Sequence, residues 1–206
     1  MAECVLIPGA DDAAIAEWLH QRLAAALVAG SGEIAISVPG GSTPFPILER
    51  LAAMELDWPR VTVWPGDDRA VPQTHPASNA GRIRGILDPR GGKVVALDER
   101  LEPPRFALVW LGMGADGHVA SLFPSSDPRP DDPLRVRRIT PDPLPPEAPF
   151  DRISLTIPAL LNCDELLFVI RGAEKRALFE AALKGEGDLP VTRLLGAAKQ
   201  PVTCFT

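Results

Sequence analysis

The sequence FALVWLGMGADGHVASLFP, residues 106–124, is the most informative stretch of the chain for both the fold and a functional site. Residues 106–111 are all apolar, as in a strand buried on both faces of a sheet. The glycines that follow end this strand and deliver Asp116 and His118 to its carboxyl end. Ligands of open α/β sheets bind outside the carboxyl ends of the strands. His118 is one of only three histidines, so imidazole chemistry has few other candidates.

On either side of this stretch, short apolar runs alternate with helical patterns. Asp11 or Asp12 can cap the first helix, and Ser78 can cap the third. Predicted strands cover residues 4–7, 34–38, 61–64, 106–111, 153–157 and 166–170, and predicted helices end near residues 29, 54, 87 and 184. The alternation predicts a three-layer α/β fold: a mostly parallel, Rossmann-like sheet with helices on both faces. A length of 206 residues fits one domain, residues 1–206.

Two segments are predicted to lack long regular elements. Residues after the third strand form a polar loop as far as Ser78. Nine of the 23 prolines lie between Pro124 and Pro149, which excludes a long helix there. We interpret that tract as a rigid excursion around a site, with a candidate strand at residues 135–140.

The composition narrows the classes of function. A net charge of -6 and a pI near 5.1 argue against binding to nucleic acid or to an acidic membrane. Cys4, Cys163 and Cys204 form neither a disulfide framework nor a zinc motif. No run approaches the roughly 20 apolar residues of a membrane span. Residues 1–3 lack the basic segment of a signal peptide, so a cytoplasmic protein is expected.

The glycines at 112, 114 and 117 match the spacing of a dinucleotide-binding fingerprint. That fingerprint requires a following helix, a second strand and an acidic residue about 20 residues further on. Here the glycines lead to His118 and then to the proline-rich tract, so a nicotinamide or flavin site is disfavoured.

Gly40-Gly41-Ser42-Thr43-Pro44 follows the second strand and opens a helix. Ser42 or Thr43 can cap this helix, and Pro44 suits its first position. Free amides at a helix start form an anion site suited to phosphate. A capped helix without a ligand explains these residues equally well.

Charged residues at the ends of other predicted strands and helices are weaker indications of a functional site. Asp67-Asp68-Arg69 follows the third strand and by itself is typical of a solvated turn. Arg152 begins a predicted strand, and Lys175 lies near the start of the last predicted helix. Each is ordinarily a surface charge, although both positions allow contact with a shared phosphate.

Taken together, these segments resemble the 6-phosphogluconolactonases, within a wider group that includes glucosamine-6-phosphate deaminases and isomerases. The resemblance covers most of the chain and rests on four ordered blocks. They are residues 39–44 (PGGSTP), 67–79 (DDRAVPQTHPASN), 111–124 (LGMGADGHVASLFP), and RISLT at 152–156 followed by Gly172-x-x-Lys175.

Two details favour the lactonase branch. Ser121-Leu122-Phe123-Pro124 replaces the Phe-Asn-Glu-Pro-like stretch of the deaminases, so their ring-opening Glu is missing. Asp67-Asp68-Arg69 is close to the Asp-Glu-Arg of lactonases, with Asp68 shorter than the usual Glu. Residues 88–105 are also short for the family, and the last five residues lack an acid that often ends the pattern.

The resemblance implies hydrolysis of 6-phospho-D-glucono-1,5-lactone to 6-phosphogluconate in the pentose phosphate pathway. His118 would be the general base, Asp67 or Asp116 would orient it, and Arg69 would stabilise the oxyanion. The phosphate would be bound by Gly40, Gly41, Ser42, Thr43, Arg152 and Lys175. No metal, organic cofactor or obligate protein partner is expected. The alternatives are an amino-sugar phosphate deaminase or isomerase and a non-catalytic sugar-phosphate sensor.

Overall fold

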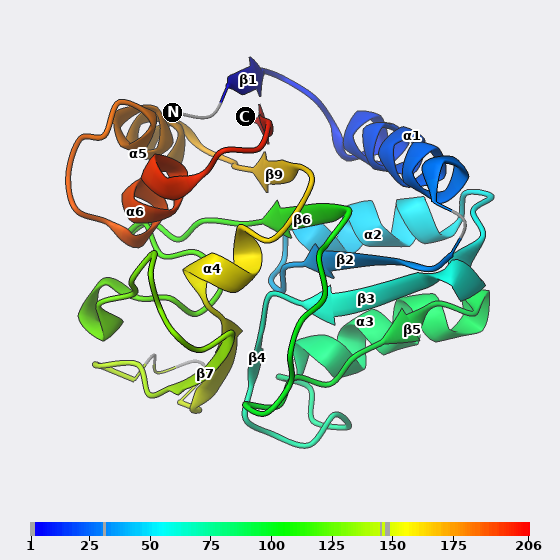
Figure 1. Cartoon of the computed structure of the whole chain (residues 1–206), viewed down its shortest axis with the longest axis horizontal. Helices are drawn as coiled ribbons and strands as arrows, with labels where there is room; N and C mark the ends of the chain where they lie inside the picture. The colour runs from blue at the N-terminus through cyan, green and yellow to red at the C-terminus, as the bar shows by residue number, and fades with distance from the viewer. Residues whose placement is uncertain (1–2, 31, 145, 147–148) are drawn as a thin grey trace.

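The computed structural model describes residues 3–30, 32–144, 146 and 149–206, so Met1 and Ala2 of the signal-peptide argument lie outside the described residues. A seven-stranded sheet in the order β1-β10-β9-β6-β2-β3-β5 forms its centre (Figure 1). Every neighbouring pair in this sheet is parallel. Its strands are β1 (Cys4–Ile7), β2 (Ile34–Val38), β3 (Val61–Pro65), β5 (Lys93–Val94), β6 (Leu108–Leu111), β9 (Leu166–Val169) and β10 (Val202–Phe205). The mostly parallel sheet predicted from the sequence is confirmed.

Both faces of this sheet are covered, because successive side chains of each strand point to opposite sides. Trp110 and Leu167 belong to the apolar cluster beneath α1 (Asp12–Ala29), α2 (Pro44–Ala52) and α3 (Asn79–Leu87). Val109 and Phe168, their neighbours along the same strands, belong to the cluster on the other face. There lie α4 (Ile157–Leu160), α5 (Ala173–Leu183) and α6 (Pro190–Ala197) (Figure 1). The three-layer arrangement thus follows from the alternation within β6 and β9.

The helix starts agree with the sequence except at α2. Asp11 accepts a hydrogen bond from the Ala14 amide at 2.8 Å, and Ser78 accepts one from the Gly81 amide at 3.0 Å. Pro44 occupies the first turn of α2 as expected, but Thr43 makes no capping bond with its side chain. The expected side-chain cap is therefore wrong for Thr43, and no such bond occupies the first amides of α2.

A second, smaller sheet corrects two further predictions. β4 (Asp67–Arg69) pairs antiparallel with β8 (Arg152–Leu155), which pairs antiparallel with β7 (Val136–Ile139). The polar loop predicted after β3 is thus partly a strand, and the predicted strand at 153–157 ends early because Ile157 begins α4. The candidate strand at 135–140 is confirmed as β7. β5, β10 and α6 are elements that the sequence pattern did not predict.

Candidate active site

A cavity of about 280 Å³ opens at the carboxyl ends of β2, β6 and β9. This is where the parallel sheet predicts a ligand site. The residues that line it are Pro39, Gly40, Gly41, Ser42, Thr43, Pro44, Asp67, Trp110, Gly112, Met113, Gly114, His118, Ala120, Val169, Ile170, Arg171 and Lys175. The structure therefore brings together His118, Asp67, Lys175 and the loop at residues 40–43, which the sequence analysis singled out separately.

His118 is held in a tight turn that follows β6. The Gly114 amide donates to the His118 carbonyl at 2.9 Å, and Gly117 has a positive φ of 77°. A side chain at Gly114 would collide with His118, because a Cβ there would lie 2.2 Å from two atoms of the imidazole. The ring of Phe123 packs on the imidazole, with 4.9 Å between the ring centroids. Glycine and aromatic packing together fix the ring's position.

Asp116 is the carboxylate that contacts the histidine. Its Oδ1 lies 2.6 Å from Nδ1 of His118, and it also accepts from the His118 amide at 3.2 Å. Partial burial acts to raise the pKa of Asp116, but the His118 charge and these hydrogen bonds leave that pKa below its usual value. An ionised Asp116 favours a proton on Nδ1, so Nε2 carries the basic lone pair. The sequence left open which acid contacts His118, and the structure favours Asp116.

Asp67 lies in the same cavity without a direct hydrogen bond to His118 among the contacts of the described residues. Its Oδ2 accepts from the Ser121 hydroxyl at 2.5 Å. Burial raises the pKa of Asp67, opposed by the Ser121 hydrogen bond and by the charges of Arg69 and His118. Asp67 is thus close enough to stabilise a positively charged imidazole through its field.

Asp68, in contrast, points away from this cavity and is bound at the start of α3. Its carboxylate accepts from the Ser78 hydroxyl at 3.0 Å and from the amides of Asn79 and Ala80 at 2.6 and 3.0 Å. Four donors including the Arg69 amide surround one buried carboxylate at a helix N-terminus. Asp68, the short residue in place of Glu, therefore links β4 to the start of α3 through these hydrogen bonds.

Arg69 and Arg152 do not line the His118 cavity. They face each other in the β4–β8 ladder, and Arg69 donates to Asn79 Oδ1 at 2.8 Å. Asn79 in turn donates to the Asp67 carbonyl at 2.8 Å, and its side chain occupies the space where a Cβ on Gly40 would lie. Burial and the charge of Arg69 lower the pKa of Arg152, and the charge of Asp67 offsets part of this fall. Both arginines thus adjoin the site through Asp67 and Asn79.

Two cationic side chains also line the cavity. Lys175, in the first turn of α5, donates to the Met113 carbonyl at 2.9 Å. Arg171 follows β9 and lines the same cavity, where it is tied to the Ala10 carbonyl at 3.0 Å and to Asp12 at 3.2 Å. The sequence analysis missed Arg171. Its place directly after a strand at the ligand-binding edge is the signal that could have identified it.

Within the described part of the chain, no three His, Cys, Asp or Glu side chains are grouped to hold a metal ion. No described helix is both long enough and apolar enough to cross a membrane.

Comparison with known proteins gives a consistent result. Residues 10–203 match the family described as glucosamine-6-phosphate isomerases/6-phosphogluconolactonase. A 6-phosphogluconolactonase of Pseudomonas putida is 36% identical, over 89% of this chain and 84% of its own length. That of Caulobacter vibrioides is 33% identical, over 82% and 81%. The crystal structure of the Thermotoga maritima 6-phosphogluconolactonase superposes with a TM-score of 0.81 at 26% identity, covering 100% of this chain and 99% of the other.

Proposed function

This chain belongs to the family of glucosamine-6-phosphate isomerases and 6-phosphogluconolactonases, and we propose that it hydrolyses 6-phosphogluconolactone with water activated by His118. It is a lactone hydrolase, and the relatives compared above are named 6-phosphogluconolactonases. A place in the pentose phosphate pathway is part of the proposal. The observation that carries the proposal is one cavity lined by His118, which Asp116 contacts, and also by Lys175, Arg171 and the loop at 40–43. That arrangement suits a substrate with a reactive carbonyl and a phosphate.

The reaction needs one base that later acts as an acid. His118 Nε2 takes a proton from water, and the resulting hydroxide adds to the lactone carbonyl carbon. The tetrahedral oxyanion then collapses, the bond from this carbon to the ring oxygen breaks, and the ring oxygen receives the proton from the imidazolium. Asp116 holds the imidazole tautomer, and the charge of Asp67 stabilises the imidazolium.

Arg69 and Arg152 take an indirect part in this proposal. Neither lines the cavity, so we propose a role through Asp67 for both, while the oxyanion role of Arg69 and the phosphate contact of Arg152 stay predictions. Burial raises the pKa of Asp67, and the charge of Arg69 opposes that rise. Burial lowers the pKa of Arg152, and the charge of Asp67 opposes that fall. We propose that Arg69 favours the ionised form of Asp67 while Asp67 faces the imidazolium.

The phosphate is held by Lys175, Arg171 and the loop at residues 40–43. Gly41 has a φ of 104°, a conformation that brings the backbone close to a ligand without hindrance from a side chain. Pro44 and Pro46 have no amide proton, so in the uncapped first turn of α2 it is the Phe45 amide that can donate to an anion, together with the amides of the loop. A cytoplasmic location without a membrane, nucleic-acid or protein partner is part of the proposal.

The test is the decay of freshly generated 6-phosphogluconolactone, followed by coupling its product to 6-phosphogluconate dehydrogenase. Because the lactone also hydrolyses unaided, the rate is compared with that of the same solution without protein. We expect a protein-dependent acceleration. Folded protein that gives none contradicts the proposal, and release of ammonia from glucosamine 6-phosphate would place the chain in the deaminase branch instead.

Replacement of Lys175 by Ala is expected to raise KM by about 10–100-fold, with a smaller effect on kcat. One charge-assisted hydrogen bond to the phosphate contributes roughly 1.5–3 kcal/mol, and each 1.4 kcal/mol corresponds to a factor of ten. Steady-state kinetics measure both constants, with Lys184→Ala as the control because Lys184 is an exposed residue at the other end of α5. A Lys175→Ala protein with wild-type KM would remove Lys175 from the phosphate site.

A further inference from the structure

The Phe123 ring that packs on His118 belongs to the segment 123–128, which contacts α6 at residues 127 and 128. Ser126 donates to the Phe123 carbonyl through its amide at 3.0 Å and through its hydroxyl at 2.8 Å. Asp127 follows in a left-handed conformation with a φ of 44°. The segment 123–128 is therefore one tight turn, and the position of the Phe123 ring depends on where Asp127 and Pro128 are held.

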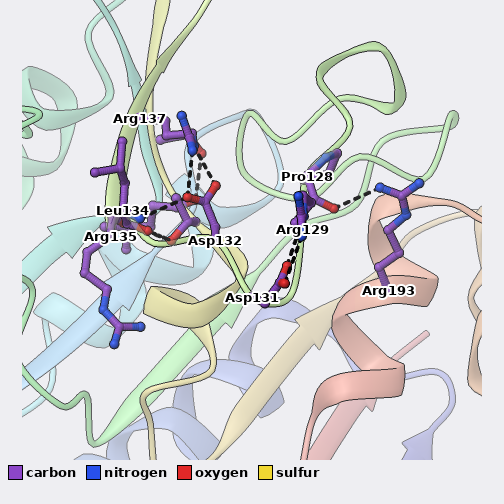
Figure 2. A network of polar contacts seen from close by, with 11 residues as sticks. Pro128, Arg129, Asp131, Asp132, Leu134, Arg135, Arg137 and Arg193 are labelled. Atoms are coloured by element: carbon purple, nitrogen blue, oxygen red, sulfur yellow. Dashed lines mark hydrogen bonds and ion pairs between the residues drawn. The ribbon is translucent and has the colours of Figure 1, made fainter.

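Arg193 of α6 holds that end. One guanidinium nitrogen donates to Asp127 Oδ1 at 2.5 Å and to the Pro128 carbonyl at 3.0 Å, as Figure 2 shows for Pro128. The other two nitrogens form a bidentate pair with Asp188 at 2.6 and 2.7 Å. The Arg193 side chain is 25% exposed, compared with 66% for Arg129, whose pair with Asp131 stays within its own loop. A planar fork with four oxygen partners fixes direction as well as distance.

The same helix supports the His118 turn from its other side. The Val191 amide donates to the Gly117 carbonyl at 3.1 Å. Leu189 packs so closely that a Cβ on Gly117 would lie 2.9 Å from its side chain. The residue before His118 and the ring packed on His118 are therefore both anchored to the first half of α6.

We propose that Arg193 is a positioning residue, which holds the segment 123–128 on α6 so that Phe123 fixes the His118 imidazole in its reactive orientation. This inference rests on the proposed function, because the orientation matters through the base that His118 supplies. Arg193 does not line the cavity, so its effect on the rate would act through Phe123 and not through contact with the substrate.

Arg193→Ala is expected to lower kcat by about tenfold, because small misplacements of a catalytic group reduce turnover strongly. KM should change by less than about twofold, since the residues proposed to bind the phosphate are untouched. Arg193→Lys should recover part of kcat, because one ammonium keeps the charge but cannot reproduce the fork. Wild-type kcat in Arg193→Ala, measured well below the unfolding temperature, overturns the proposal.

Two further variants separate positioning from a general loss of ion pairs. Arg137 pairs with Asp132 at 2.5 and 2.8 Å, which joins the proline-rich tract to itself, so Arg137→Ala should keep wild-type kcat (Figure 2). Asp127→Asn removes the charge that links the segment to α6 and leaves the Arg193–Asp188 pair, and Asn tolerates the left-handed backbone. Asp127→Asn should lower kcat by less than Arg193→Ala does, because the bond from Arg193 to the Pro128 carbonyl remains, and it provides a test even where Arg193→Ala fails to fold. An equal kcat loss in Arg137→Ala, or none in Asp127→Asn, overturns the proposal.

A readout without turnover separates this proposal from the lactonase function. The aromatic ring current of Phe123 shifts the NMR signals of the His118 ring protons, which are assigned by their loss in His118→Ala. Arg193→Ala should displace these signals more than Arg137→Ala does. Unchanged signals overturn the positioning role even if the wild-type protein hydrolyses the lactone. Absence of hydrolysis by the wild-type protein contradicts the function alone, since the ring signals still report whether Arg193 positions Phe123.

Discussion

His118→Ala is expected to lower kcat by about 10²–10⁴-fold, the usual contribution of a general base. The alanine cannot accept the proton of the attacking water, nor return it to the ring oxygen. KM should stay close to the wild-type value, because the residues proposed to bind the phosphate, Lys175, Arg171 and the loop at 40–43, are unchanged. This variant therefore tests the proposed chemical step.

The measurement is the same coupled assay, corrected for spontaneous hydrolysis, which becomes a large part of the signal when kcat falls. His20→Ala is the matched control, because His20 lies on α1 and contacts the Glu55 carbonyl at 2.8 Å instead of the cavity. Near-wild-type turnover by His118→Ala would remove His118 as the base. Comparable losses in both histidine variants would show that the effect is not specific to the site.

Gly114→Ala is expected to lower kcat by about 100-fold in a protein that still folds. A Cβ at this position would lie 2.2 Å from the His118 ring and 2.6 Å from Asp116 Oδ1, so the imidazole and its partner must move away. Since the displaced atoms belong to side chains, the backbone of the turn can remain in place. The loss should therefore come from a misplaced base, in a protein whose unfolding temperature stays close to that of the wild type.

Kinetics and thermal unfolding of the same preparation test this expectation. Gly85→Ala serves as the control, because nothing lies within 4 Å of a Cβ at Gly85 in α3. Alanine is the better helix former by up to about 1 kcal/mol, so the control should keep its activity and gain slightly in stability. A Gly114→Ala protein with wild-type kcat would contradict the reactive geometry inferred for His118.

Elements with a strong local signal were predicted with their bounds. β1, β2 and α3 agree with the sequence to the residue, because apolar runs and the Ser78 cap are local features. β4 was not predicted, since Asp-Asp-Arg carries no apolar pattern and becomes a strand only by pairing with β8. α6 was missed although its first half supports the His118 turn.

The sequence by itself determined the sheet class, the edge at which the candidate site lies, and the presence of an acid and a histidine in one glycine turn. These features depend on periodicity and on residues a few positions apart, which chain geometry alone constrains. It also indicated the family through four ordered blocks.

Only the tertiary structure decided which partner each charged side chain contacts. In the structure Asp116 contacts His118, Asp68 binds the start of α3, and Arg171 lines the cavity. Met113 and Lys175, 62 residues apart, meet because β6 and β9 are neighbours in the sheet, and Arg193 reaches Asp127 across 66 residues. Such contacts depend on strand order and helix packing, which a local pattern of residues does not contain. The contacts of individual charged residues therefore follow from the fold.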